Sequence, residues 1–177
     1  MIHLPTTPII YLRDAVNPAL ELLPARMGEI EARVQLAAIA LQESALAHRW
    51  QVIDLKRPQV KGPARGLLQF EQGTRASRGG VWGVYLHAAS SAHLRNLCAA
   101  RGCAFDPVAI YAAIETDDVL SAGVGRLLLW TDPRALPALG DQAAAWDLYY
   151  RCWRPGQPHP EKWPTNYRAA LAAVGEP

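Results

Sequence analysis

Apolar residues recur with a helical period over residues 29–45, near the start of the chain. Ile30 and Val34 lie on one face at a spacing of four, and Leu36 and Ile39 lie on the opposite face. A surface helix keeps one polar face, so a helix that is apolar nearly all round is surrounded by protein. The pattern therefore predicts a buried central helix.

Helical patterns return in six other segments, most of which open with a capping residue or an early proline. Examples are Asn17-Pro18, Asp106-Pro107, Thr116-Asp117-Asp118 and Asp141. An Asn or Asp side chain accepts hydrogen bonds from the free backbone N–H groups of the first turn. The predicted helices cover residues 17–24, about 84–100, 107 onward, 117–130, 141–153 and 164–175.

The helical period disappears over residues 49–80. Two short apolar runs, 51–53 and 67–70, lie there among glycine, proline and basic residues, which is typical of loops and a small β-hairpin. The proline-rich run 155–160 is also expected to be irregular, since proline fixes φ and lacks an N–H donor. The sequence thus predicts a mostly α (α+β) fold in a single domain, residues 1–177.

The composition is that of a chain that folds around its own core, and it narrows the classes of partner. Half of the 177 residues are hydrophobic, and alanine, the strongest helix former, is abundant. Basic residues exceed acidic ones by only two, 18 against 16, too few for a protein whose main task is binding nucleic acid. The longest uncharged stretch, residues 79–94, is too short and too polar for a membrane span. We therefore expect a monomer with no nucleic-acid partner and no membrane insertion.

The cysteines and histidines predict neither a disulfide framework nor a metal centre. Three cysteines cannot all pair, so Cys98, Cys103 and Cys152 are expected to be free thiols in a reducing compartment. The spacing of Cys98 and Cys103 from His87 and His93 does not match the pattern of a zinc site. No cofactor is expected.

Charge is distributed unevenly along the chain. Residues 49–78 hold seven basic and two acidic residues, a net charge of +5, whereas the remainder carries −3. A basic loop region beside a cleft suits an anionic polymer. The alternative is a solvated loop that is merely rich in arginine.

Glu43 stands at the end of the predicted buried helix, four residues after Ile39 and therefore on an apolar face. Burial disfavours the charged form of a carboxyl group and raises its pKa, which is what a general acid needs near neutral pH. The alternative is a structural acid that is paired with a cation.

Two further features bear on ligand binding. The run Gly66-Leu67-Leu68-Gln69 can form a turn whose backbone approaches a ligand while the Gln amide bonds it, or simply a turn that enters a strand. Six of the 14 aromatic residues lie in the C-terminal segment, and aromatic faces suit sugar rings. These residues either form a core, as favoured for Trp146 and Tyr149, or contact a ligand, as favoured for Trp153 and Tyr167.

Together, Glu43-Ser44 ending a buried helix, the run 66–69 and the late Asn166-Tyr167 resemble the signatures of lytic transglycosylases and goose-type lysozymes. In that family the signatures are Glu-Ser, Gly-Leu-Met-Gln, an Ala-Tyr-Asn-Ala-Gly stretch and a late Tyr. Here Leu68 replaces the Met, and residues 146–154 occupy the place of the third stretch. The chain is similar to the small, stand-alone phage or prophage versions.

The resemblance implies a lysozyme-like helical domain with a small β-hairpin beside the cleft, and peptidoglycan glycan strands as its partner. Glu43 would protonate the glycosidic oxygen between N-acetylmuramic acid and N-acetylglucosamine. Ser44 and Gln69 would orient the acid and the sugar, and Tyr167 would hydrogen-bond Glu43 or the acetamido group. The other residues expected to bind substrate are Gly66, Leu68, Tyr149, Tyr150 and Trp153.

A lytic transglycosylase needs no second carboxylate, because the 6-hydroxyl of the muramoyl sugar closes a 1,6-anhydro ring. A hydrolase would need a positioned water, and the basic segment offers two acids to orient it, Asp54 and Glu71. Glu71, two residues after Gln69, is favoured. The alternative for Glu71 is a surface carboxylate that balances Arg75.

The predicted function is therefore a peptidoglycan-cleaving muramidase, an endolysin of the lytic transglycosylase type. The alternatives are a non-catalytic lysozyme-like virion or wall-binding protein, and a chitinase. The first residues, Met1 to Pro5, show no secretory signal. We expect the protein to accumulate in the host cytoplasm and reach the wall through a separate pore protein, or to travel in a virion.

Overall fold

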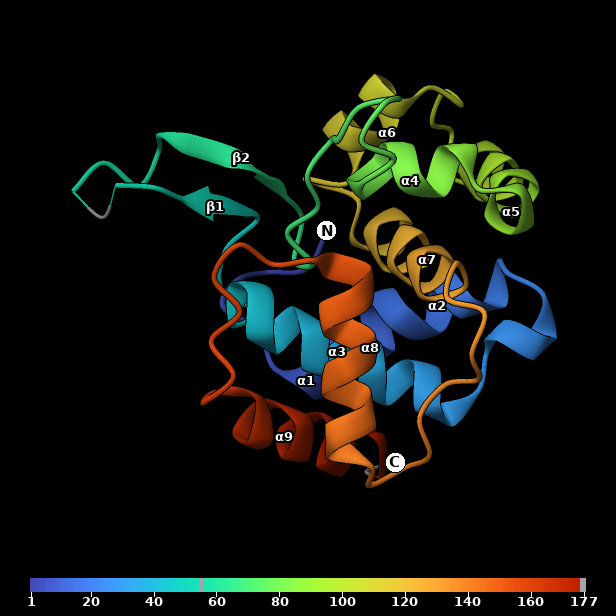
Figure 1. Ribbon diagram of the computed structural model, residues 1–177. Coiled ribbons are helices and arrows are strands. Elements are labelled where there is room, and N and C mark those ends of the chain that lie inside the picture. Colours follow the sequence, from blue (N-terminus) through green and yellow to red (C-terminus); the bar gives the residue numbers. More distant parts are fainter. Residues whose placement is uncertain (55, 176–177) are drawn as a thin grey trace.

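Helix α3 (Ile30–Ser44) is the predicted buried helix, and it runs through the centre of the molecule (Figure 1). Residues on both of its faces, among them Val34, Leu36 and Ile39, are almost completely buried, as the apolar pattern predicts. The helix ends where Ala45 adopts a left-handed backbone with a φ of 51°. Glu43 therefore lies in the last turn of a helix that neighbouring elements hold in place.

The structure, a computed structural model, describes residues 1–54 and 56–175. This part of the chain is mostly helical with one small two-stranded antiparallel sheet, so the predicted fold class is confirmed at this level. In chain order the elements are α1 (Pro8–Tyr11), the π-helical turn η1 (Leu12–Val16), α2 (Asn17–Glu21), the 3-10 turn η2 (Ala25–Met27), α3, β1 (Trp50–Val52), β2 (Lys61–Arg65), α4 (Gly80–Leu86), α5 (Ala88–Ala100), α6 (Pro107–Ala113), α7 (Asp118–Leu129), α8 (Gln142–Trp153) and α9 (Trp163–Gly175).

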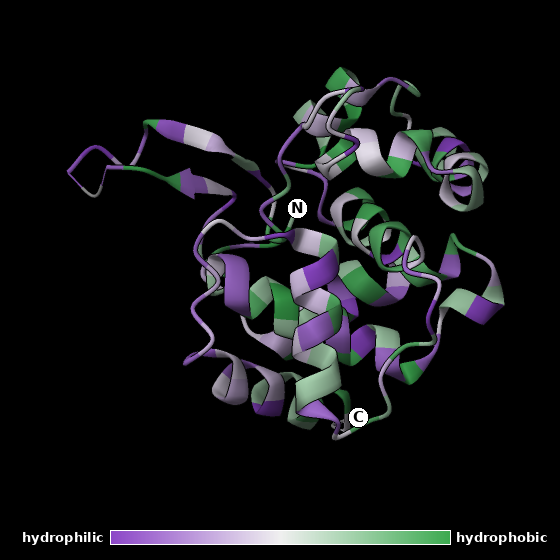
Figure 2. Cartoon of the chain, viewed as in Figure 1, coloured by the Kyte–Doolittle hydropathy of each residue, from purple (hydrophilic) through white to green (hydrophobic). Residues whose placement is uncertain are grey.

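Helix α7 is the second buried helix, and two glycines let it pack closely against its neighbours. A Cβ on Gly125 would lie 2.4 Å from Leu68 Cδ1 and 3.0 Å from Leu36 Cδ2. A Cβ on Gly123 would lie 2.5 Å from Leu97 Cδ2, on helix α5. Figure 2 shows hydrophobic residues concentrated along α3 and α7, whereas hydrophilic residues face outward on α8.

Three predicted caps are confirmed. Asp106, Asp117 and Asp141 precede α6, α7 and α8, and each side chain accepts backbone N–H groups of the first turn at 2.9–3.0 Å. The short side chain of aspartate reaches these donors only when its own backbone is outside the helix. The starts of these helices were therefore readable from local sequence.

Two helix boundaries differ from the predictions. The chain is helical from Pro8 to Glu21, and Asn17 lies inside this segment instead of capping a new helix. Its Oδ1 accepts a hydrogen bond of 3.0 Å from Arg33 Nε, so the side chain serves a tertiary contact. The segment predicted as one helix over 84–100 begins earlier and is split, because His87 has an extended backbone with a ψ of 123°.

The β-hairpin forms, but its second strand is not the predicted one. Strand β1 pairs with β2, with Trp50 opposite Arg65, and the two strands extend away from the helical body (Figure 1). The run 67–70, predicted as a strand, is not one: residues 66–69 form a turn, and Phe70 makes an isolated β-bridge with Arg65. Gly66 and Gln69 both have a positive φ, 71° and 50°, which bends the backbone too sharply for a strand.

A buried ion pair fastens the chain's start to the base of the hairpin and to α7. Arg49 Nη2 lies 3.0 Å from Asp118 Oδ2, and both side chains are more than nine-tenths buried. The backbone N–H of Ile2 donates to the same carboxylate at 2.7 Å. Three segments that are distant in sequence thus share one buried carboxylate.

Candidate active site

Glu43 lies where two hollows in the surface meet. A cleft of about 1110 Å³ and a second hollow of about 730 Å³ share four lining residues, which are Gln42, Glu43, Gln51 and Gln69. Together the two hollows make a groove that extends in both directions from the carboxyl group of Glu43. Such a shape suits a chain-like ligand that extends beyond the reacting bond.

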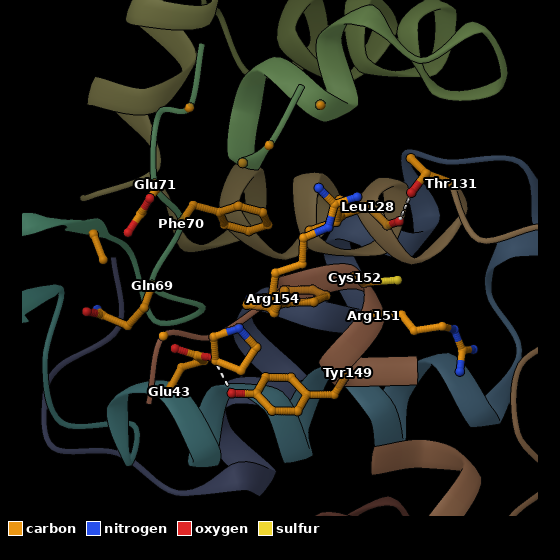
Figure 3. A pocket seen from close by; sticks show the side chains of 18 of the residues that line it. Glu43, Gln69, Phe70, Glu71, Leu128, Thr131, Tyr149, Arg151, Cys152 and Arg154 are labelled. Atoms are coloured by element: carbon orange, nitrogen blue, oxygen red, sulfur yellow. Dashed lines mark hydrogen bonds between the residues drawn. The ribbon is translucent and has the colours of Figure 1, made fainter. Parts of the chain in front are cut away.

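Burial raises the pKa of Glu43 from its ordinary 4.5 to about 7. A hydrogen bond from Tyr149 opposes this effect, since the phenol O–H donates to Glu43 Oε1 at 2.7 Å and favours the carboxylate (Figure 3). Burial and the neighbouring carboxylate also raise the pKa of Tyr149, so this phenol keeps its proton. The carboxyl group is therefore divided between its two protonation states near neutral pH.

The two oxygens of Glu43 have different surroundings. Oε1 accepts the Tyr149 hydrogen bond, whereas no donor bonds Oε2 among residues 1–54 and 56–175. The free oxygen can carry the proton into the groove. This arrangement can donate a proton to a ligand atom and later take one back, which is the chemistry of a general acid and base.

Ser44 ties the end of α3 to the turn that follows β2. Its Oγ lies 2.7 Å from the carbonyl oxygen of Leu67 and accepts the backbone N–H of Leu46 at 3.2 Å. Ser44 also lines the smaller hollow. The hydroxyl therefore helps to position Glu43 through the backbone, and it makes no hydrogen bond to the carboxyl group.

Gln69 reaches the groove through the left-handed backbone of this turn. Its Nε2 donates to the carbonyl oxygen of Gly66 at 2.7 Å, and its side chain lines both hollows. Figure 3 shows Gln69 and Glu43 on the same side of the view, Gln69 on the turn and Glu43 on α3 below it. The structure thus brings together the two short sequences that the family resemblance had singled out.

Helix α8 contributes one aromatic face to the cleft. Tyr149 and Trp153, four residues apart, both line it, as the helical period requires. The indole N–H of Trp153 donates to the carbonyl oxygen of Leu68 at 2.9 Å, so the ring is held in place. Tyr150 lies on another face, is half exposed, and does not line either hollow.

Tyr167 was predicted to bond Glu43 or the acetamido group of the substrate; the bond to Glu43 is wrong, and Tyr167 lines neither hollow. Tyr167 is buried, and its hydroxyl accepts the backbone N–H of Gly140 at 3.1 Å. Tyr149, for which a core role was favoured, bonds the carboxyl group instead. Both rings pack against Trp163, so the aromatic cluster forms a core and also reaches the cleft at one edge.

Two other residues predicted to bind substrate are part of the packing beneath the groove. Leu68 is fully buried and does not line either hollow. Gly66 is buried as well, and a Cβ there would lie 2.7 Å from the carbonyl oxygen of Ile114. Their contribution to the site is the shape of the turn that presents Gln69.

The basic segment 49–78 does not form an open positive surface. Four of its cations bind carboxylates. Arg49 pairs with Asp118, and both Lys61 and Arg65 pair with Glu115, acids from other parts of the fold, whereas Arg57 pairs with Asp54 of the same segment. Of the segment's seven cations, Arg78 alone lines a hollow in the described chain. The uneven charge therefore overstated how many cations of this segment are available to a ligand, and binding of an anion stays a prediction.

Glu71 lines the cleft and is exposed to solvent (Figure 3). Within the described residues it forms no ion pair with Arg75, which was the alternative role considered for it. The cleft is also lined by two other carboxyl groups, those of Glu43 and Asp132. Asp132 is already paired, because its Oδ2 lies 2.9 Å from Arg151 Nε. Glu71 is therefore the second carboxylate that remains available to a ligand in the cleft.

Sequence reasoning missed the role of Gln42. This residue holds the proline-rich run 155–160, which forms one wall of the cleft, the proline-rich wall. Its Nε2 donates to the carbonyl oxygen of Pro158 at 2.8 Å, and its Oε1 accepts from Asn166 Nδ2 at 2.8 Å. Arg154, at the end of α8, also lines the cleft and was not predicted. Its position just before Pro155-Gly156 marked a helix end but gave no sign of a ligand contact.

The fold and the site define a mostly helical protein with a carboxyl group of raised pKa in a long groove. Comparison with protein-family models, with curated proteins and with solved structures finds no match to this chain. In the part of the chain that the structure describes, no helix is long and apolar enough to cross a membrane. No group of three or more His, Cys, Asp or Glu side chains there could hold a metal ion.

Proposed function

We propose that the protein is a muramidase that cleaves peptidoglycan glycan strands, with Glu43 as the general acid and base. The observation that carries this proposal is a carboxyl group of pKa about 7 at the junction of two hollows. An acid with this pKa is well matched to proton transfer near neutral pH. The lysozyme-like character of the fold belongs to the same proposal.

In the first step, Glu43 gives its proton from Oε2 to the glycosidic oxygen that follows N-acetylmuramic acid. The C–O bond breaks, the departing sugar leaves with a new hydroxyl group, and positive charge develops at the anomeric carbon. The substrate's own N-acetyl oxygen stabilises this carbon. The Tyr149 O–H bond to Oε1 stabilises the carboxylate that Glu43 becomes.

In the second step, the 6-hydroxyl oxygen of the muramoyl sugar attacks the anomeric carbon. The Glu43 carboxylate removes the proton of this hydroxyl group at the same time. The product is a 1,6-anhydro ring, and Glu43 regains its proton. We favour this transglycosylase outcome because no carboxylate needs to act besides Glu43. Glu71 is the candidate that would orient a water molecule if the outcome is hydrolysis.

Product analysis on purified peptidoglycan tests this function. We expect the wild-type protein to release soluble fragments with anhydro ends, detected by mass spectrometry. Glu43→Gln should lower the rate by about a thousandfold, since it removes the proton but keeps an acceptor for Tyr149. Glu31→Gln, at the other end of the same helix, is the matched control and should retain activity.

Other outcomes of this experiment separate the competing functions. Reducing ends in place of anhydro ends would identify a hydrolase, and loss of that activity in Glu71→Gln would assign the water to Glu71. Cleavage of chitin but not of peptidoglycan would identify a chitinase. Release of no fragment by wild-type protein, with Glu43→Gln behaving identically, would contradict any enzymatic role and leave a binding module.

A further inference from the structure

The cleft carries an arginine pair whose charge is not balanced by the protein. We propose that Arg78 and Arg154, with His87, bind a carboxylate carried on a side arm of the glycan substrate. This inference rests on the proposed function for the identity of the ligand. These residues would select glycans with acidic side arms, a distinction between substrates that Glu43 alone does not make.

Arg78 and Arg154 both line the larger hollow and lack an acidic partner. No carboxylate of residues 1–54 or 56–175 lies within ion-pair distance of either side chain. Arg78 Nη2 donates one long hydrogen bond, 3.4 Å, to the carbonyl oxygen of Leu86. Arg151 on the same wall differs, because it is already bound to Asp132.

The two arginines line the cleft from different elements, and their surroundings are neighbours in the fold. The contact with Leu86 places the Arg78 guanidinium at the junction of α4 and α5. Figure 3 shows Arg154 extending into the pocket toward Leu128, at the end of α7. Ser90, in the first turn of α5, donates to the carbonyl oxygen of Leu127 at 3.0 Å, so this junction and the end of α7 are neighbours.

His87 supplies a second, independent sign of a missing ligand. Its Nδ1 is buried and has no hydrogen-bond partner among the described residues, although its side chain lines the same cleft. A buried polar nitrogen without a partner is costly unless a ligand completes it. His87 also precedes α5, a helix of 13 residues whose N-terminal end favours anions.

Both arginines are among the six non-glycine residues of the described chain with a positive φ, and Arg154 is the left-handed C-cap of α8. Arg78 and Arg154 both have a φ of 50°, in the left-handed region that disfavours residues with a side chain. Glycine would relieve this cost at either position, yet a long cationic side chain is present. Non-glycine residues in this region occur preferentially at ligand-binding positions.

A carboxylate fits these groups better than a neutral sugar. An arginine guanidinium presents a planar set of donors that binds carboxylate oxygens with two parallel hydrogen bonds. In peptidoglycan the carboxylate has two sources: the lactyl group of a muramoyl sugar that carries no peptide, and, where a peptide is joined to that group through an amide, the acidic residues of the peptide. Chitin has neither, so this end of the cleft would favour peptidoglycan over chitin.

Binding measurements on the Glu43→Gln protein test the inference without turnover. The probes are an N-acetylglucosamine–N-acetylmuramic acid disaccharide with a free lactyl carboxylate, the same disaccharide extended by an L-Ala-D-Glu peptide, and its uncharged lactyl amide. Added Arg78→Gln or Arg154→Gly changes should raise the Kd for an acidic probe at least about tenfold, measured by calorimetry. Arg154→Gly also suits the left-handed backbone, so loss of folding is not expected.

The Kd for the lactyl amide should not change in these variants. The matched control is Arg75→Gln, because Arg75 is exposed, lies near Arg78 in sequence and does not line the cleft. If the variants lose affinity for the peptide probe alone, the peptide is the source of the carboxylate. If they lose affinity for the disaccharide acid, the source is the lactyl group. An equal loss for the amide, no loss, or no binding of any probe would overturn the inference. The proposed function fails separately, if wild-type protein releases no fragments from peptidoglycan.

Discussion

At the scale of single residues, the site depends on one carboxyl group that burial and a phenol influence in opposite directions. Burial raises the pKa of Glu43 to about 7, and the Tyr149 hydrogen bond restrains that rise. The general acid is the protonated form. Activity is therefore expected to fall as the pH rises through about 7, where that form is lost.

Tyr149→Phe should move the alkaline limb of the pH–activity profile upward by about one pH unit. Removal of the O–H donor takes away the interaction that favours the carboxylate, so the pKa of Glu43 rises further. The measurement is kcat/KM for peptidoglycan fragments between acidic and alkaline pH. Tyr150→Phe, a half-exposed neighbour outside the cleft, should leave the limb unchanged. A downward shift in Tyr149→Phe would refute the assignment.

At the scale of elements, the site is a junction between the end of α3 and the turn over residues 66–69. Ser44 bonds this turn through Leu67, and the turn presents Gln69 to the groove. The turn requires a left-handed backbone at Gly66, where the space for a Cβ is already occupied by Ile114 and Ser121. This glycine is thus required for both conformation and packing.

Gly66→Ala should lower the free energy of unfolding by about 3 kcal/mol, from the left-handed backbone together with overpacking. Gly102→Ala is the matched control, because Gly102 has a similar φ of 63° but open space around its Cβ position. It should cost only about 1 kcal/mol. Urea denaturation measures both values. Equal losses would show that packing against Ile114 and Ser121 adds nothing to the cost.

At the scale of the whole molecule, buried polar contacts between distant segments hold the walls of the groove together. The Arg49–Asp118 pair joins the hairpin base to α7, and Asp118 also accepts the backbone N–H of Ile2 in the N-terminal segment. Gln42 joins α3 to the proline-rich wall and to Asn166 on α9. Each contact spans dozens of residues in sequence, so it depends on the completed fold.

Asp118→Asn should lower the free energy of unfolding by about 3 kcal/mol, because Arg49 is left charged and buried without a counter-charge. Asp117→Asn is the matched control. It also removes an arginine partner, Arg101, but that pair is on the surface and asparagine still caps α7. Its cost should be below about 1 kcal/mol. A similar cost for both variants in thermal and urea denaturation would contradict the importance of the buried pair.

Local sequence patterns predicted much of the helical framework and part of the site. The apolar period identified α3, and aspartate caps marked the starts of α6, α7 and α8. Glu43 and Gln69 were found from short sequences, and the structure places both on one groove. The second strand of the hairpin was missed because the positive φ of Gln69 is not visible in an apolar run.

By itself the sequence determined what depends on neighbours within a few residues: most of the helical segments, the starts of those that an aspartate caps, and that Glu43 ends a buried helix. Only the tertiary structure decided that Tyr149, 106 residues away, bonds Glu43 while Tyr167 does not. It also decided which arginines are neutralised and which face the cleft. The physical reason is that helical periodicity and capping are local interactions, whereas the pKa of a buried acid and the pairing of charges depend on contacts made when distant segments pack.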